Sequence, residues 1–284
     1  MPRTLPSRGI GRAGLFALSL LAACGTLTIA QERKLGEEFS REIRKEVVLL
    51  RDSVVTGYVE RIGQDLVRAA GPQPFPYYFY VVDDDEINAF AGPAGHIYVH
   101  TGVILKARNV AELAGVIAHE VGHVAKRHIA HNYGRQRNTG IAHQGAVIAA
   151  GVLGGSAAAG AANLGGALAS AAYLNKFGRD AERESDLFAV EVLPKAGYDP
   201  IGLVTFFKTL RSETGSGGWA FLSSHPATDE RIEETRLLIA ALPARSDLRS
   251  DDSGRFEIIQ RRIRLLIGEA SPSGESRSER RRAD

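Results

Sequence analysis

The chain has 284 residues, a formal net charge of +2 and a single cysteine. Three arginines and no acidic residue lie in residues 1–23, so the chain without this segment carries 32 basic against 33 acidic residues. A nearly neutral protein of this kind gives no reason to expect nucleic acid as a partner. One cysteine also excludes an intramolecular disulfide.

Residues 1–23 have the features of a cleaved export signal. Basic residues precede the apolar run Ala13 to Ala23, which has about half of the roughly 20 residues that a membrane-spanning helix needs. The run ends in Leu21-Ala22-Ala23-Cys24, which resembles the bacterial lipobox. This resemblance implies that Cys24 becomes the lipidated N-terminus, and Gly25 after it favours the outer over the inner membrane. The alternative is a plain signal peptide followed by an ordinary buried cysteine.

The next segment, residues 31–70, predicts helices that are charged on one side and apolar on the other. Gly71 to Pro74 end these helices. Tyr77 to Val82 predicts a strand because it is rich in aromatic and β-branched residues, and Asp83 to Asp85 form its turn. Three adjacent aspartates suggest calcium, but their spacing does not fit an EF-hand loop, so we interpret them as a polar turn.

A second strand is predicted at Ala94 to His100, with alternate residues on opposite faces. His96 and His100 would lie about 13 Å apart along it, too far to share one metal ion. As an edge strand it would offer free backbone groups to an extended peptide, which binds as an added strand. The alternative is an edge strand that binds no ligand.

The stretch Val110 to His131 predicts a mostly buried helix that contains His119-Glu120-Val121-Gly122-His123. Asn109 suits its N-cap, Glu112 stands at the capping-box position, and Gly134 follows as a C-terminal stop. Residues four apart share one helix face, so both imidazoles can bind one metal ion while the glutamate addresses a water bound to it. Because two histidines can also meet by chance on a core helix, a third ligand is decisive.

Residues 138–175 contain no Asp, Glu, Lys or Arg and consist largely of Gly and Ala. The segment is long enough for a membrane hairpin, but Ala and Gly are weak hydrophobes, and the many glycines weaken any helix. We expect a loosely packed helical hairpin or flap beside the active site rather than a membrane span.

The helix itself does not supply the third ligand. A metzincin requires glycine at position 126 and histidine at position 129, where this chain has Lys126 and Ile129. His128 and His131 are expected to face solvent or to cap the end of the helix.

A better candidate is Asp180 to Ala189, which predicts a helix ended by Pro194 and Gly197. Glu182 and Asp186 share one of its faces, so Glu182 can bind the metal while Asp186 orients a histidine.

The HExxH motif followed by Glu182-Arg183-Glu184-Ser185-Asp186 resembles peptidase family M48, which includes HtpX-like proteins and periplasmic lipoproteins of the BepA and LoiP type. Further matching blocks are Asn88 to Ala91 with Gly95 to Val99, Gly197 to Pro200, and Ser224 to Arg231. The resemblance implies an α+β, mostly helical zincin fold of the gluzincin type, with a small sheet whose edge strand borders the active-site helix. We expect a catalytic domain at 24–268 and, from composition, a disordered tail at 269–284.

The site residues follow from the motif and the resemblance together. One zinc ion per chain is expected, held by His119, His123 and Glu182, with Glu120 as the general base. His225 is expected near the metal, either as an oxyanion hydrogen-bond donor or as an inhibitory zinc ligand; a surface turn is the remaining alternative.

Substrate is expected to bind at Gly95, His96, Ile97 and Tyr98 in the edge-strand block. The resulting prediction is a zinc endopeptidase, lipid-anchored in the bacterial periplasm at the outer membrane, that cleaves misfolded or stalled envelope proteins. The alternative is a non-hydrolytic chaperone or assembly factor on the same fold. Glu120 argues against this alternative, because a binding module needs no general base.

Overall fold

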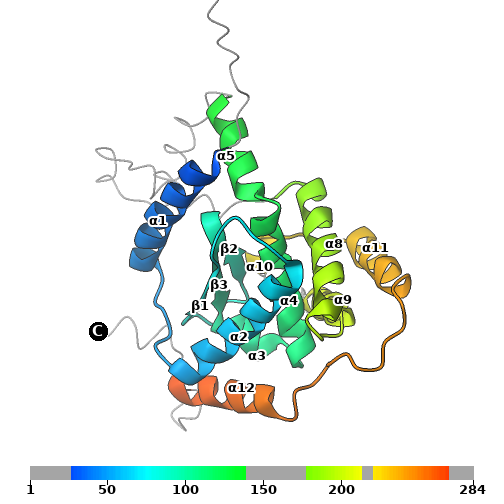
Figure 1. Cartoon of the computed structure of the whole chain (residues 1–284). Helices are drawn as coiled ribbons and strands as arrows, with labels where there is room; N and C mark the ends of the chain where they lie inside the picture. Colours follow the sequence, from blue (N-terminus) through cyan, green and yellow to red (C-terminus); the bar gives the residue numbers. More distant parts are fainter. Residues whose placement is uncertain (1–26, 139–176, 213–219, 269–284) are drawn as a thin grey trace, which may run out of the picture.

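The described part of the chain is mostly helical and contains one three-stranded sheet, which confirms the predicted fold class (Figure 1). The computed structural model describes residues 27–138, 177–212 and 220–268. The first elements are α1 (Ile29–Glu46), α2 (Ser53–Ala70), β1 (Tyr78–Val82), β2 (Ala89–Ala91), the short 3₁₀ turn η1 (Pro93–Gly95), β3 (His96–His100) and α3 (Thr101–Lys106). They are followed by α4 (Val110–Ala125), α5 (His128–Asn138), α8 (Arg179–Lys195), α9 (Ile201–Ser212), α10 (Ala220–Ser224), α11 (Asp229–Ala240) and α12 (Arg255–Leu266).

Several sequence predictions fall outside the described residues. These are the signal at 1–23, the lipidation site Cys24, the tail at 269–284 and, apart from Asn138 at the end of α5, the flap at 138–175. Among the described residues, no helix is both long and apolar enough to cross a membrane.

The sheet has the strand order β1-β3-β2. β3 pairs in parallel with β1 and antiparallel with β2. The turn into β3 is tight because Ala94 and Gly95 adopt left-handed φ angles of 55° and 94°. The prediction that Ala94 to His100 forms an edge strand is therefore wrong, since β3 is bonded to a neighbour on each side. The edge strand that packs against α4 is β2, which is only three residues long.

Alternation along β3 places its side chains in two apolar clusters. Ile97 and Val99 belong to the main core, whereas Tyr98 stacks on Tyr80 and Phe90 with ring centroids 4.7 and 4.9 Å apart. Helix α1 covers this second face (Figure 1) and contributes Phe39 to the cluster.

Helix α4 lies between the sheet and the pair α8 and α9 (Figure 1), and nearly all of its residues are buried. Two glycines permit this close packing. A Cβ at Gly115 would lie 2.8 Å from the Leu203 backbone in α9, and one at Gly122 would lie 3.0 Å from Cα of Ser185 in α8. Small residues on α4 therefore let the acidic helix α8 approach the two histidines of the motif.

The N-terminus of α4 follows the prediction in part. Asn109 is the N-cap, and its Oδ1 accepts a hydrogen bond from the Glu112 backbone N–H at 3.0 Å. The Glu112 carboxylate accepts the backbone N–H of Arg108 at 2.8 Å, together with the Arg108 guanidinium. Glu112 therefore stabilises the helix start without the predicted capping box to Asn109.

The C-terminus of α4 differs from the prediction. The helix ends at Ala125, Arg127 adopts a left-handed φ of 55°, and a separate helix begins at His128. The predicted continuous helix to His131 is wrong. Gly134 lies within α5 and does not end a helix.

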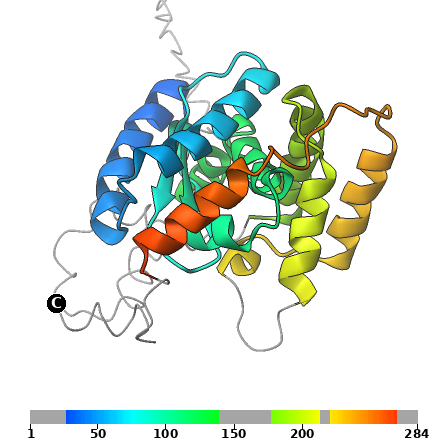
Figure 2. The same ribbon diagram turned by 90° about the horizontal axis from the view of Figure 1, so that it is seen from below.

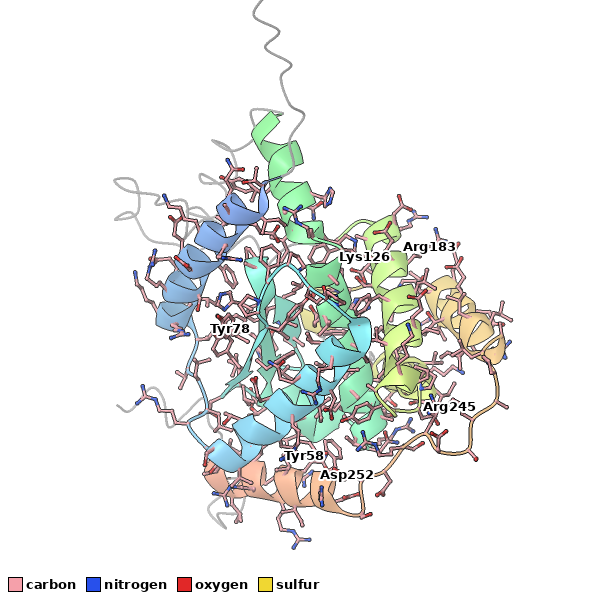
Figure 3. The ribbon with its side chains drawn as sticks, in the orientation of Figure 1. Tyr58, Tyr78, Lys126, Arg183, Arg245 and Asp252 are labelled. Atoms are coloured by element: carbon pink, nitrogen blue, oxygen red, sulfur yellow. The ribbon has the colours of Figure 1, made fainter. Side chains whose placement is uncertain are left out.

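The C-terminal helix α12 lies across the outside of α2 (Figure 2). Tyr58 of α2 stacks on Phe256 of α12 with ring centroids 6.4 Å apart. The Tyr58 hydroxyl also donates a 2.6 Å hydrogen bond to Asp252, just before α12 (Figure 3). These contacts join the end of the described chain to its N-terminal helices.

Candidate metal centre

The two motif histidines meet on the inner side of α4. Both side chains are fully buried, and their Nε2 atoms lie 3.0 Å apart. Glu182 approaches from α8, with Oε2 3.4 Å from Nε2 of His119 and Oε1 3.5 Å from Nε2 of His123. The structure thus brings together the three predicted ligands, which come from two separate helices.

His225 completes this cluster from the segment after α10. Its Nδ1 lies 3.3 Å from Nε2 of His119 and 3.0 Å from Oε1 of Glu182. One ligand atom from each of the four residues falls within 4.8 Å of all the others. Zinc binds nitrogen and oxygen at about 2.0–2.2 Å in a tetrahedron, which separates its ligand atoms by roughly 3.3–3.6 Å. The donor types and spacings therefore fit a zinc ion.

Glu120 lies beside the cluster with its carboxylate fully buried. Neither of its oxygens has a hydrogen-bond partner within the described residues, although Nε2 of His225 lies 3.4 Å from Oε1. Burial and the charge of Glu182 raise the pKa of Glu120, and the opposing effects of His225, His119 and the Ala91 backbone do not cancel this rise. An unsatisfied buried carboxylate is costly in a stable core, and this one is placed to take a proton from a water molecule at the site.

The charges of the cluster favour a cation. Burial would raise the pKa of Glu182, but His225, His119 and His123 hold this pKa well below its usual range. Burial lowers the pKa of His123 far below its ordinary value. Burial also opposes the charged form of His119, yet hydrogen bonds to Asp186 and Glu182 raise the pKa of His119 to about 9. A proton on His119 therefore competes with a metal ion for the cluster.

Asp186 lies next to His119, on the face of α8 that the sequence predicts. Its Oδ1 lies 2.8 Å from Nδ1 of His119, on the side of the ring away from the cluster. Burial would raise the pKa of Asp186, but His119 and Arg231 keep it below its usual value. A carboxylate in this position fixes the ring and makes Nε2 a better ligand.

Arg231, to which the sequence predictions give no role, contacts two carboxylates of the site. Its guanidinium donates two hydrogen bonds to Asp186, at 2.8 and 2.9 Å, and one to Glu182 at 2.6 Å. It is 5% exposed and lies over the Phe207 ring, 5.0 Å from the centroid. Arg231 is the last residue of the Ser224 to Arg231 block, and its place in that block is the only feature of the sequence that points to it.

The sequence predictions also give no role in the site to His128, which contacts His123, or to Glu184, which contacts His128. The prediction that His128 faces solvent or caps the helix is wrong, since it is buried, with its Nδ1 3.0 Å from Nδ1 of His123. Its Nε2 lies 2.9 Å from Oε2 of Glu184, a side chain that is 58% exposed. His131, by contrast, is exposed.

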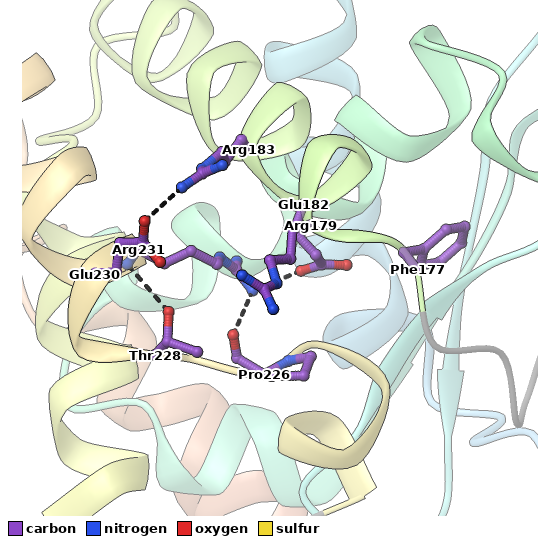
Figure 4. A pocket seen from close by; sticks show the side chains of 8 residues that line it. All are labelled: Phe177, Arg179, Glu182, Arg183, Pro226, Thr228, Glu230 and Arg231. Carbon is purple, nitrogen blue, oxygen red and sulfur yellow. Dashed lines mark hydrogen bonds and ion pairs between the residues drawn. The ribbon is translucent and has the colours of Figure 1, made fainter.

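A pocket of about 350 Å³ adjoins the cluster. Figure 4 shows Arg231 reaching between Glu182 and Pro226 along its wall, with Phe177 at one end. The other lining residues are Arg179, Arg183, Thr228 and Glu230. Because Glu182 lines both, the pocket connects to the edge of the candidate metal site.

The four residues expected to bind substrate lie in β3 and in the turn before it. His96 is buried and stacks on Tyr78 at 5.0 Å between centroids, while Ile97 and Tyr98 are fully buried in the two apolar clusters. Gly95 sits in the tight turn before β3, where a Cβ would lie 2.0 Å from the carbonyl oxygen of Pro76. β3 cannot accept a substrate peptide as an added strand, because it is the central strand and is already paired on both sides.

A HExxH helix whose imidazoles meet a glutamate from a second helix is the arrangement of gluzincin metallopeptidases. The sequence profile "Peptidase family M48" matches residues 53–238, a range that includes all four residues of the cluster. The chain belongs to this family of zinc metalloproteases, which confirms the resemblance drawn from its motifs.

Individual relatives agree with this assignment. The chain is 32% identical over 219 residues to the β-barrel assembly-enhancing protease of Escherichia coli strain K12, covering 76% of this chain and 45% of that protein. The same protease of Yersinia pestis is 33% identical over 222 residues, with the same coverage of 76% and 45%. Metalloprotease LoiP of Escherichia coli strain K12 is 28% identical over 235 residues, covering 82% of this chain and 89% of LoiP. The chain thus spans about half the length of the β-barrel assembly-enhancing proteases that it matches.

Proposed function

We propose that this chain is a zinc-dependent endopeptidase of the bacterial cell envelope that cleaves misfolded or stalled envelope proteins. The observation that carries the proposal is the convergence of His119, His123 and Glu182 beside the buried, unsatisfied carboxylate of Glu120. A binding module on the same fold would have no use for this carboxylate.

The roles of the side chains follow from their positions. Zinc held by His119, His123 and Glu182 would supply Lewis acidity, which lowers the pKa of water towards 7 and polarises a peptide carbonyl. Glu120 accepts the proton of the attacking water and returns it to the departing amine nitrogen as the peptide C–N bond breaks. Asp186 and Arg231 keep His119 and Glu182 in place throughout this proton transfer.

The outer edge of β2 is the proposed site for the substrate backbone. β2 is an edge strand that packs against α4, and the Ala91 backbone lies close enough to Glu120 to affect its pKa. An extended peptide added to this edge would pass next to the general base. This proposal replaces the assignment to Gly95, His96, Ile97 and Tyr98.

We propose that His225 acts as a latch, that is, as an added zinc ligand that displaces the water and holds the enzyme inactive. Nδ1 of His225 lies 3.3 Å from Nε2 of His119 and 3.0 Å from Oε1 of Glu182, which is about the spacing between the His119 and Glu182 ligand atoms themselves. This nitrogen can therefore occupy the coordination position that the attacking water would take. The same ring faces Glu120 through Nε2. His225→Ala should therefore raise proteolysis and retain zinc, whereas lost activity with retained zinc would support an oxyanion donor instead.

The envelope location is supported by the lipobox-like sequence ending at Cys24 and by the name of the relatives, which refers to β-barrel assembly. Lipidation at Cys24 would tether the catalytic domain to the membrane, with the outer membrane favoured by Gly25. Unfolded or misassembled envelope proteins are the proposed substrates.

The test uses purified protein with zinc and two substrates, casein and an unfolded outer-membrane porin. Cleavage is expected, and Glu120→Gln should reduce its rate on the order of 10²- to 10⁴-fold while zinc stays bound. A zinc-loaded protein that cleaves neither substrate, both as the wild type and as His225→Ala, would contradict the proposal. Prevention of porin aggregation by both the wild type and Glu120→Gln, without cleavage, would instead support the chaperone alternative.

A further inference from the structure

The imidazole of His128 lies directly behind that of His123. The two Nδ1 atoms are 3.0 Å apart, while Nε2 of His123 points to the cluster, 3.0 Å from Nε2 of His119. On its other side, His128 places Nε2 2.9 Å from the Glu184 carboxylate. A chain of three polar contacts thus leads from the candidate metal site to the surface of α8.

One arrangement of protons satisfies these contacts. A nitrogen that binds a metal carries no proton, so a neutral His123 that offers Nε2 has its proton on Nδ1. That N–H donates to Nδ1 of His128, which as an acceptor is itself unprotonated. His128 then carries its proton on Nε2 and donates it to Glu184.

The break between α4 and α5 makes this geometry possible. In a continuous helix a residue five positions after His123 would lie about 140° away around the axis. Here the left-handed Arg127 turns the chain, so that His128 folds back towards α4. Arg127 is held by a 2.7 Å hydrogen bond to the buried Glu32 of α1 and by a further bond to the carbonyl of Leu27.

We propose that His128, supported by Glu184, is a positioning residue for His123. It fixes the ring orientation of His123 and keeps the proton on Nδ1, which leaves Nε2 available to the metal. This rests on the proposed function, since it assumes that His123 binds zinc. The two histidines would then be supported differently: His119 directly by the buried Asp186, and His123 through an imidazole whose carboxylate partner reaches solvent.

The test measures zinc affinity in the metal-free protein by competition with a chromophoric chelator. His128→Leu removes the acceptor and should weaken zinc binding on the order of 10- to 100-fold, the usual effect of losing a partner of a metal ligand. His128→Asn should restore most of the affinity, because its Oδ1 can take the place of Nδ1. Glu184→Ala should weaken binding several-fold. The control is Glu191→Ala, at an exposed position on the same helix, with no expected change.

A second readout is the visible spectrum of the protein loaded with Co²⁺. Its bands should shift in His128→Leu and Glu184→Ala but not in Glu191→Ala, whereas a residue needed only for folding would change the thermal stability without shifting the bands. Unchanged zinc affinity and an unchanged spectrum in folded His128→Leu would overturn the proposal. If that variant does not fold, Glu184→Ala decides in the same way. A wild-type protein that binds no zinc would refute the proposed function as well.

Discussion

Arg231→Met tests the arginine that holds two carboxylates of the centre. Arg231 is 5% exposed, and its guanidinium donates hydrogen bonds to both Asp186 and Glu182. Breaking a buried ion pair by removing one partner typically costs about 3–5 kcal/mol. Asp186 keeps His119 and Glu182 keeps His225 as partners, so we expect the lower end, about 3 kcal/mol. For a chain of this size, that loss corresponds to a fall in Tm of roughly 6–12 °C.

The assay is thermal unfolding followed by circular dichroism, with and without zinc. Saturating zinc should reduce the loss of stability, because a bound cation supplies positive charge next to Glu182 in place of the missing guanidinium. Arg231→Lys keeps the charge but not the two-pronged contact with Asp186, so its Tm should fall between those of the wild type and Arg231→Met. Arg236→Met is the matched control, since Arg236 lies on the same helix in an exposed pair with Glu233, and its Tm should not change. A metal-free Arg231→Met protein as stable as the wild type would refute this reasoning.

Three further predictions concern the fold. Gly115→Ala should destabilise the protein by about 1–3 kcal/mol in urea denaturation, because its Cβ would meet the α9 backbone. Gly57→Ala, whose Cβ would meet nothing within 4 Å, should stabilise the protein by about 0.5–1 kcal/mol. A more stable Gly115→Ala than Gly57→Ala would contradict the packing of α4 against α9. Arg127→Met leaves Glu32 buried without its ion pair and should lower the free energy of unfolding by about 1–3 kcal/mol in the same assay. An unchanged free energy of unfolding would show that this ion pair does not stabilise the break between α4 and α5. Burial raises the pKa of Glu32 above 4.5 despite Arg127, so its contribution to stability is fully present below that pH and is lost as the pH rises through the folded-state pKa. Glu32→Gln should flatten that part of the curve of unfolding free energy against pH, and an unchanged curve would contradict this assignment.

The sequence was sufficient for the features that depend on local spacing. Helical periodicity places His119 with His123 and Glu182 with Asp186, and the structure brings these four residues together, although their roles stay proposals. The family assignment and the mostly helical fold are confirmed. Local pattern sufficed here because each pair lies within one turn of one helix.

The remaining features depend on contacts between distant segments. The helix break at Arg127 is stabilised by Glu32, 95 positions earlier, so no nearby glycine or proline marks it. In a continuous helix, His128 would point away from His123. The edge strand β2 has only three residues, too few for an alternating pattern to identify, and the central place of β3 depends on pairing with both neighbours that its own sequence does not reveal.

Metal analysis of Glu182→Gln beside the wild type tests whether side chains from α4 and α8 together bind one zinc ion. We predict about one zinc per wild-type chain after dialysis, and its loss in Glu182→Gln, because an amide is a much weaker zinc ligand than a carboxylate. Equal zinc content and affinity in the two proteins would contradict the assignment of Glu182 as the third ligand.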